Sequence, residues 1–185
     1  PLRLVGSEMC IRDRTLSGNA GLYYQLPPYT ALGFKDNSGN YTNKDLKYMQ
    51  VMETSLGLDW HLQDRLMISA EGFFKRYGRM PLSLQDNIPL ACKGDDYGTI
   101  GNETLIPTAD GRAYGVEGML RWQMPGRFNF VSSLTIFRSE YRNGNGDNLS
   151  ETKYISSAWD NRFILNVSGT YNLPRRWSIG GKLSY

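Results

Sequence analysis

The fold of this chain is decided by two stretches, YMQVMETSLGLDWHL at residues 48–62 and LMISAEGFFK at residues 66–75. In both stretches apolar and polar residues alternate one by one. A period of two predicts a β-strand with one apolar and one polar face. The short polar segment 63–65 lies between them and predicts a tight hairpin turn. Such a hairpin fits either half of a soluble sheet or one hairpin of a membrane barrel.

The composition restricts the choice of class. The chain has 185 residues, a hydrophobic fraction of 40%, a mean hydropathy of −0.47 and a net charge of +3. No apolar run approaches the ~18 residues of a membrane helix. Helical spans are therefore excluded, whereas a barrel is not, because barrel strands are only half apolar. The net charge is too small to suggest a nucleic-acid partner.

The alternation recurs along the chain. Strands are predicted at 18–25, 111–124, 128–139, 162–171 and 177–185. Short turns near residues 64, 126 and 175 alternate strictly with long segments at 26–46, 78–110 and 139–160. Loops this long are uncommon in compact soluble domains. Short turns on one rim and long loops on the other are typical of a transmembrane β-barrel.

The tryptophans support the same interpretation. Trp60, Trp122 and Trp177 lie beside the three short turns, each on the apolar face of its strand. Aromatic residues at one depth predict a girdle at the membrane interface. The opposite girdle is predicted to contain Tyr48, Phe74 and Tyr114.

Several segments, taken in order, resemble a known family. They are ISAEGFFKRY at 68–77 followed by Met80–Pro81, DGRAYGVE at 110–117 and WDNRFILN at 159–166. Together they resemble the C-terminal part of the barrel of a TonB-dependent outer-membrane receptor. The segment YQLPPY at 24–29 is similar to versions from the Bacteroidota.

The resemblance implies a barrel of about 22 strands with an N-terminal plug, in the outer membrane of a Gram-negative bacterium. It also implies import of a siderophore, cobalamin, haem or oligomeric nutrient, driven by the TonB complex. We therefore expect residues 15–185 to form a partial barrel, truncated at both ends and lacking the plug. The expected fold is all-β: an antiparallel up-and-down sheet of six to seven long strands, forming an open arc. The implied partners are outer-membrane lipid, the protein's own plug, the TonB complex and a ligand at the extracellular loops.

The first 14 residues, PLRLVGSEMCIRDR, show no period. The piece GSEMCIRDR resembles a tail found on translated metagenomic fragments, which arises from read-through of sequencing adapter. We therefore expect residues 1–14 to be non-native. The cysteines, Cys10 and Cys92, provide neither a disulfide framework nor the spacing of a metal site.

Little in the sequence indicates catalysis. His61 is the single histidine, and a catalytic base beside Asp59 or Asp64 is the one enzymatic reading. The pattern places His61 at the short-turn end, facing the lumen, so we predict no catalytic residue, no enzyme and no cofactor. Two segments, 94–96 and 143–148, look like calcium loops but lack the spaced acidic set of an EF-hand. No metal site is predicted.

A set of charged residues is predicted to face the lumen: Glu53, Glu71, Glu117, Arg121, Arg162 and Lys182. They would form ion pairs within the wall, contact the plug or steer the ligand. Ligand contact is expected in the loops 26–46, 78–110 and 139–160, without assignment to single residues. Two alternatives stay open: a non-transport outer-membrane barrel, such as an adhesin or assembly protein, and a soluble β-sandwich.

Overall fold

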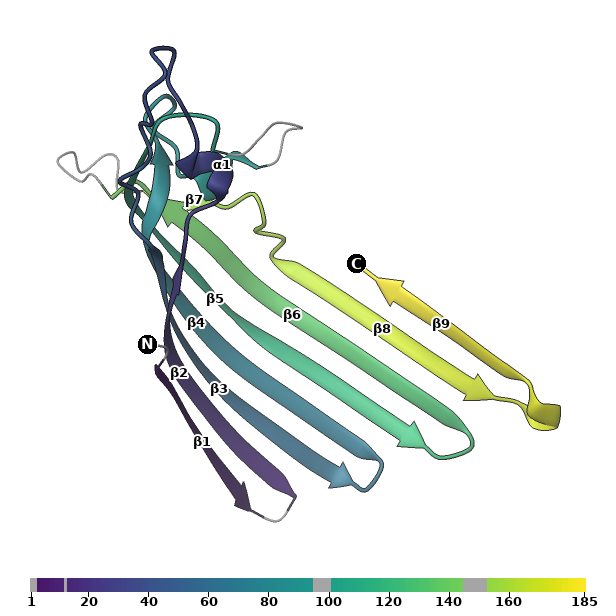
Figure 1. Ribbon diagram of the computed structural model, residues 1–185. Coiled ribbons are helices and arrows are strands. Elements are labelled where there is room, and N and C mark those ends of the chain that lie inside the picture. Colours follow the sequence, from purple (N-terminus) through teal and green to yellow (C-terminus); the bar gives the residue numbers. More distant parts are fainter. Residues whose placement is uncertain (1–2, 12, 95–100, 145–152) are drawn as a thin grey trace.

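The computed structural model describes residues 3–11, 13–94, 101–144 and 153–185. They form one antiparallel sheet of nine strands in the hydrogen-bonded order β1-β2-β3-β4-β5-β6-β8-β9, with β7 paired to β6 (Figure 1). The strands are β1 Arg3–Ile11, β2 Arg14–Gln25, β3 Met49–Gln63, β4 Leu66–Ser83, β5 Leu105–Met124, β6 Phe128–Arg142, β7 Ile155–Ser156, β8 Phe163–Asn172 and β9 Ser178–Ser184. The helical elements are α1 Tyr29–Leu32, α2 Leu90–Lys93 and a 3-10 turn at Pro174–Arg176.

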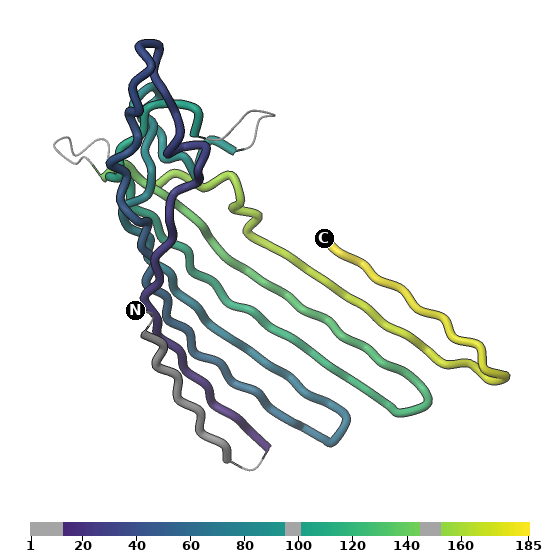
Figure 2. The backbone as a smooth tube through the Cα atoms, viewed as in Figure 1, coloured from purple at the N-terminus to yellow at the C-terminus, as the bar shows by residue number. Residues whose placement is uncertain are grey.

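The predicted all-β open arc is confirmed. Strands that follow one another in the sequence pair, except that β7 pairs only with β6, which also pairs with β8; β1 and β9 form the two edges of the sheet. Figure 2 shows the backbone running up and down from β2 to β9. Seven long strands, from β2 to β9, match the predicted number. Residues 3–11 add β1, which pairs with β2 from Arg3 opposite Leu22 to Ile11 opposite Arg14. The non-native origin of residues 1–14 stays a prediction.

Three predicted loop boundaries are wrong. The segment 78–110 was expected to be loop throughout, yet β4 continues to Ser83 and β5 already begins at Leu105. The pairing of these strands shifts between Tyr77 and Met80 and again before Leu82. Such irregularities interrupt the alternation of faces, so the period of two is lost while the ladder continues. Likewise, β6 extends to Arg142, beyond the predicted start of its loop at 139.

The register gives the sheet two faces of different chemistry. Directly opposed residues of an antiparallel pair share a face. In the central hairpin, Leu56 lies opposite Gly72 and Leu58 opposite Ala70, whereas Glu53 lies opposite Lys75. The apolar set of β3 therefore continues into that of β4. The pairing of β4 with β5 places Arg121 opposite Met67, on the same polar face as Glu53.

The space around the glycines shows which face is concave. A Cβ atom at Gly57, Gly111 or Gly115, all on the polar face, would lie 2.3–2.7 Å from a neighbouring heavy atom. At Gly72 and Gly118, on the apolar face, it would meet nothing within 4 Å. Bending a sheet crowds the side chains on its inner face and separates those on its outer face. The polar face is therefore concave and the apolar face convex.

The buried core lies at the loop end of the sheet. Ala31, Leu90 and Leu105 pack together, with Leu46 at their border. The side chain of Asn43 ties this cluster together. Its Nδ2 donates to the carbonyls of Ala31 and Glu103 at 2.8 and 2.7 Å, and its Oδ1 accepts from the Leu105 N–H at 2.8 Å. Figure 1 shows the loops gathered at one end of the sheet and the short turns at the other.

No helix within the described residues is long and apolar enough to cross a membrane.

Candidate functional site

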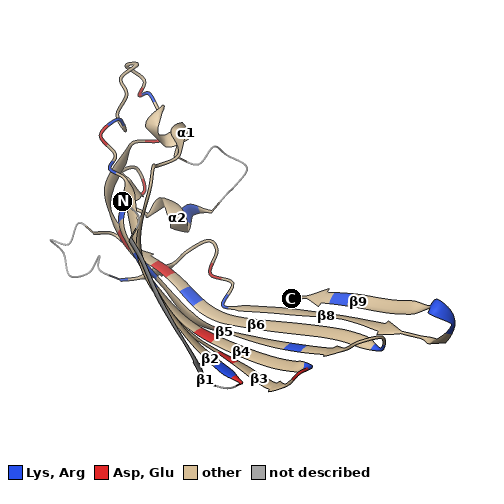
Figure 3. Cartoon of the chain, turned by 60° about the horizontal axis from the view of Figure 1, so that its bottom comes forward, with Lys and Arg blue, Asp and Glu red and all other residues tan. Residues whose placement is uncertain are grey.

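The convex face exposes a continuous apolar band. Leu56, Val116 and Ile136 lie in one cross-strand row, together with Gly72, and are 62%, 59% and 55% exposed. Large contiguous apolar surfaces mark an interaction with membrane or protein. Figure 3 shows charged residues in the loops and also at several positions along the strands.

Three of the four tryptophans, Trp60, Trp122 and Trp177, form a staggered line along the short-turn rim. Trp60 shares a cross-strand row with Ile68 and Leu120. Trp122 lies on the same face in the next row towards the short turns, opposite Leu66. Trp177 follows the 3-10 turn just outside β9 and is 71% exposed. A barrel requires such a stagger because its strands are tilted against its axis. The arrangement therefore agrees with the predicted girdle.

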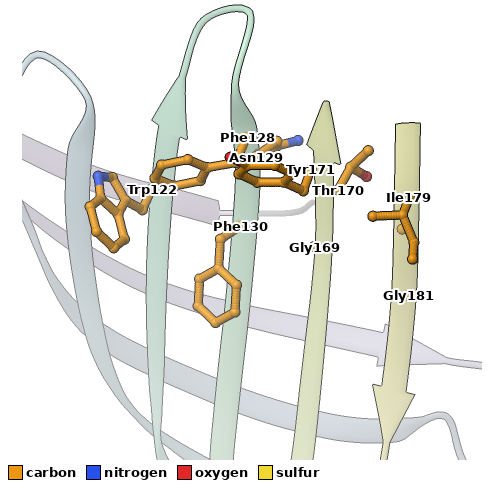
Figure 4. A pocket seen from close by; sticks show the side chains of 10 residues that line it. Trp122, Phe128, Asn129, Phe130, Gly169, Thr170, Tyr171, Ile179 and Gly181 are labelled. Atoms are coloured by element: carbon orange, nitrogen blue, oxygen red, sulfur yellow. The ribbon is translucent and has the colours of Figure 1, made fainter. Parts of the chain in front are cut away.

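A hollow of about 640 Å³ lies near this rim (Figure 4). Trp122 and Phe128 meet edge to face at its border, with ring centroids 4.8 Å apart. Its floor lies over Gly169 and Gly181, which lack side chains. Other residues that line it on the convex face are Phe130, Tyr171 and Ile179. An apolar hollow on this face suits a lipid chain rather than a polar solute.

The concave face carries the charges predicted for the lumen. The Lys75 ammonium lies 3.1 Å from the Glu53 carboxylate, a pair within the wall. Glu71 and Glu117 lie directly opposite each other on β4 and β5, and both are exposed. Within the described parts of the chain, neither carboxylate has a cation at ion-pair distance. Lys182 of β9 shares this face through Ser168 and Val131.

The prediction for Arg162 is wrong. This residue precedes β8 and has a φ of 60°, so the alternation of faces does not extend to it. Its Nε lies 3.6 Å from the Asp160 carboxylate, which also lies 3.5 Å from Arg138. Arg138 shares the convex face with Tyr114. Arg162 therefore belongs to a charged cluster on that side and not to the lumen.

At the loop end of the concave face, two tyrosines meet below the loops. The rings of Tyr77 and Tyr141 lie 5.5 Å apart. The nearby thiol of Cys92 is free, and burial raises its pKa to about 11. A thiol with this pKa is protonated at neutral pH and is a poor nucleophile. Cys92 therefore contributes packing rather than chemistry.

An ion cluster fixes the second long loop. Lys93 Nζ lies 2.6 Å from Glu103 Oε1 and 2.5 Å from Asp86 Oδ2. Burial by itself would lower the pKa of Lys93, but the hydrogen bonds and charges of Asp86 and Glu103 outweigh it and raise the pKa. The lysine stays charged and holds both ends of the loop together.

His61 and the two possible calcium loops are the remaining candidates from the sequence. His61 lies exposed near the turn end of β3, where its backbone N–H donates to the Asp13 carbonyl. Among the residues that the structure describes, no group of three or more His, Cys, Asp or Glu is arranged to hold a metal ion. Of the possible calcium loops, residues 95–96 and 145–148 lie outside the described parts.

Comparison with known families decides the identity of this sheet. The model of the β-barrel of TonB-dependent receptors matches residues 11–185. The chain belongs to the TonB-dependent receptor family. Barrels of this family lie in the outer membrane of Gram-negative bacteria. The outer face of such a barrel is apolar, as is the convex face of this receptor chain.

Solved structures agree with this fold. The ferric-catecholate import receptor Fiu of E. coli K12 is similar with a TM-score of 0.67 and 15% identity, over 97% of this chain and 23% of its own. The alcaligin receptor FauA of Bordetella pertussis gives 0.60 and 20%, over 99% and 28%. The copper transporter OprC gives 0.64 and 19%, over 98% and 26%. The receptor chain thus spans about a quarter of these proteins. No curated protein matches it.

The alternation of residues revealed both faces of the receptor wall but not the like-charged pairs within them. Glu71 opposite Glu117, and Arg76 opposite Arg112, follow from the pairing register alone. In the sequence these partners are separated by a loop whose length carries no information about register.

Proposed function

We propose that this chain is a section of the barrel wall of a TonB-dependent transporter that imports a scarce nutrient. The observation that carries the proposal is the sheet itself. It has a convex apolar face, a concave charged face, short turns on one rim and long loops on the other. A wall of this kind separates lipid from a polar lumen. An adhesin or assembly barrel is the alternative.

The paired carboxylates support a plug inside the barrel. Like charges directly opposite each other destabilise a strand pair. Glu71 and Glu117 form such a pair at mid-depth of the concave face. A cation from outside the sheet would remove the repulsion and form charge-assisted hydrogen bonds with both carboxylates. We assign this role to basic side chains of the plug.

Removing both carboxylates should loosen the plug. In the complete receptor, Glu71→Gln/Glu117→Gln should make cells severalfold more sensitive to a glycopeptide antibiotic that the outer membrane normally excludes. The measurement is the minimal inhibitory concentration at equal receptor expression. Glu53→Gln is the matched control, because Lys75 already neutralises Glu53 within the wall. Equal resistance of the double variant and the control would refute the plug contact.

The ligand is expected at the loop end of the concave face. The described parts of the connections between β2 and β3, between β4 and β5 and between β6 and β8 gather at this end, and the Tyr77–Tyr141 pair lies beneath them. The related structures are named for different cargoes: a ferric catecholate, alcaligin and copper. Since one wall serves such different ligands, the proposed cargo remains a class: a siderophore, cobalamin, haem or an oligomeric nutrient.

Energy-dependent uptake tests the proposal. The complete receptor is expressed in a Gram-negative host with and without TonB, and accumulation of labelled ferric siderophores, cobalamin and haem is measured. We expect one of these ligands to accumulate inside TonB-positive cells and only to bind at the surface of TonB-negative cells. Attachment that is equal in both strains, with no internal accumulation of any ligand, would favour an adhesin.

A further inference from the structure

The convex face carries a like-charged pair of its own. Arg76 of β4 lies directly opposite Arg112 of β5. Arg112 is held by Glu140 of β6, to whose Oε2 its Nε and Nη2 donate at 3.0 and 2.8 Å. Arg76 is exposed, and no carboxylate in the described parts of the chain lies at ion-pair distance from it. Two directly opposed guanidinium groups are electrostatically unfavourable. The one carboxylate of this row, Glu140, lies on the far side of Arg112, away from Arg76.

The Arg112 side chain is fixed in place. Its guanidinium lies 3.9 Å from the ring centre of Tyr154 and 5.6 Å from that of Tyr114. The stacking and the two hydrogen bonds to Glu140 fix the orientation of the guanidinium group. Its remaining N–H groups can donate to a further acceptor. The site is therefore preorganised for an anion.

More arginines surround the pair. Arg138 and Arg162 share Asp160, and Arg142 lies 3.5 Å from Asp110. We call the five residues Arg76, Arg112, Arg138, Arg142 and Arg162 the arginine patch. Among the described residues, the three carboxylates paired with it, Asp110, Glu140 and Asp160, leave two of its five positive charges uncompensated.

The patch lies at the outer end of the membrane span. The stretch of β4 from Leu66, at the girdle end, to Arg76 contains about eleven residues, as does the stretch of β5 from Trp122 to Arg112. A tilted strand of this length crosses a bilayer. Phe74 opposite Tyr114 forms the row immediately below the pair. The long loops lie on the same rim. The arginine patch is thus placed at the headgroups of the outer leaflet.

We propose that Arg76 and Arg112 bind the phosphate group of an anionic outer-leaflet lipid whose chains lie on the apolar band below. A phosphate between the two guanidinium groups converts their repulsion into bidentate attraction. The exposed side chains of Leu56, Val116 and Ile136 supply the surface for the acyl chains. A soluble anion would use the charges but not this band. The inference rests on the lipid-facing convex face and not on nutrient import.

Lipid binding to the purified complete receptor tests the site. The receptor in neutral detergent is titrated with diphosphoryl lipid A, and bound lipid is counted by native mass spectrometry. Arg76→Gln/Arg112→Gln should weaken binding about tenfold or more, because it removes both charged donors. Arg121→Gln, which removes the same charge from the concave face, should leave binding unchanged. Lipid A stripped of phosphate should bind the wild type as weakly as diphosphoryl lipid A binds the double variant.

Thermal unfolding shows whether the variants are still folded, so that a loss of lipid binding is not mistaken for misfolding. Without lipid, Arg76→Gln alone should have a Tm equal to or above that of the wild type, because it relieves the repulsion. Diphosphoryl lipid A should raise the Tm of the wild type more than that of Arg76→Gln. Equal lipid-induced shifts, equal binding to the double variant, or full displacement of lipid A by millimolar inorganic phosphate would overturn the proposal.

Discussion

Leu56→Lys in the complete receptor should lower the free energy of unfolding by about 2–4 kcal/mol, the cost of a lysine on the lipid face at the bilayer midplane. Leu56 lies on the convex face and is 62% exposed, between Trp60 at one girdle and Met52 towards the other. Lysine at this depth has no polar partner and must reach for an interface. Urea-induced unfolding in lipid vesicles measures the effect.

The neighbouring position provides the control. Ser55→Lys places the same charge one residue away on the concave face, and it should cost clearly less than Leu56→Lys. Leu120→Lys should fall between them, because Leu120 shares a row with Trp60 and so lies near the interface. A larger loss for Ser55→Lys than for Leu56→Lys would mean that the two faces are reversed.

Gly115→Ala should destabilise the receptor by about 1–3 kcal/mol, the usual range for overpacking. Its Cβ would lie 2.5 Å from the Ile136 carbonyl oxygen and 2.6 Å from the Phe137 Cβ. These atoms belong to the backbone of β6 or are attached to it, so they cannot rotate away. The strands would have to separate locally. The same unfolding measurement, together with the amount of folded receptor in the outer membrane, reports the loss.

Gly118→Ala on the same strand is the matched control. Its Cβ would meet nothing within 4 Å, since it points out from the convex face. We expect a change within about 0.5 kcal/mol of zero, as for ordinary surface substitutions. Comparable destabilisation by both variants would show that a loss of glycine flexibility, rather than crowding on the concave face, is responsible.

Local pattern was sufficient for the strands that cross the membrane. Leu56, Leu58 and Trp60 share a face because consecutive side chains alternate in any extended strand. The pattern failed where the ladder is irregular, as between Tyr77 and Met80, and where the backbone turns, as at Arg162. There the number of residues no longer determines the direction of a side chain.

By itself, the sequence determined the two-faced strands, their order and the sorting of short turns and long loops. These properties depend on neighbours along the chain. The sequence predicted that the charged face points to the lumen, and only the tertiary structure showed that this face is concave, because curvature depends on how all the strands pack. It also decided that Glu71 meets Glu117, that Arg76 meets Arg112, and that Asn43 joins segments from two loops. Each of these contacts depends on pairing across a loop, which the length and composition of the loop do not encode.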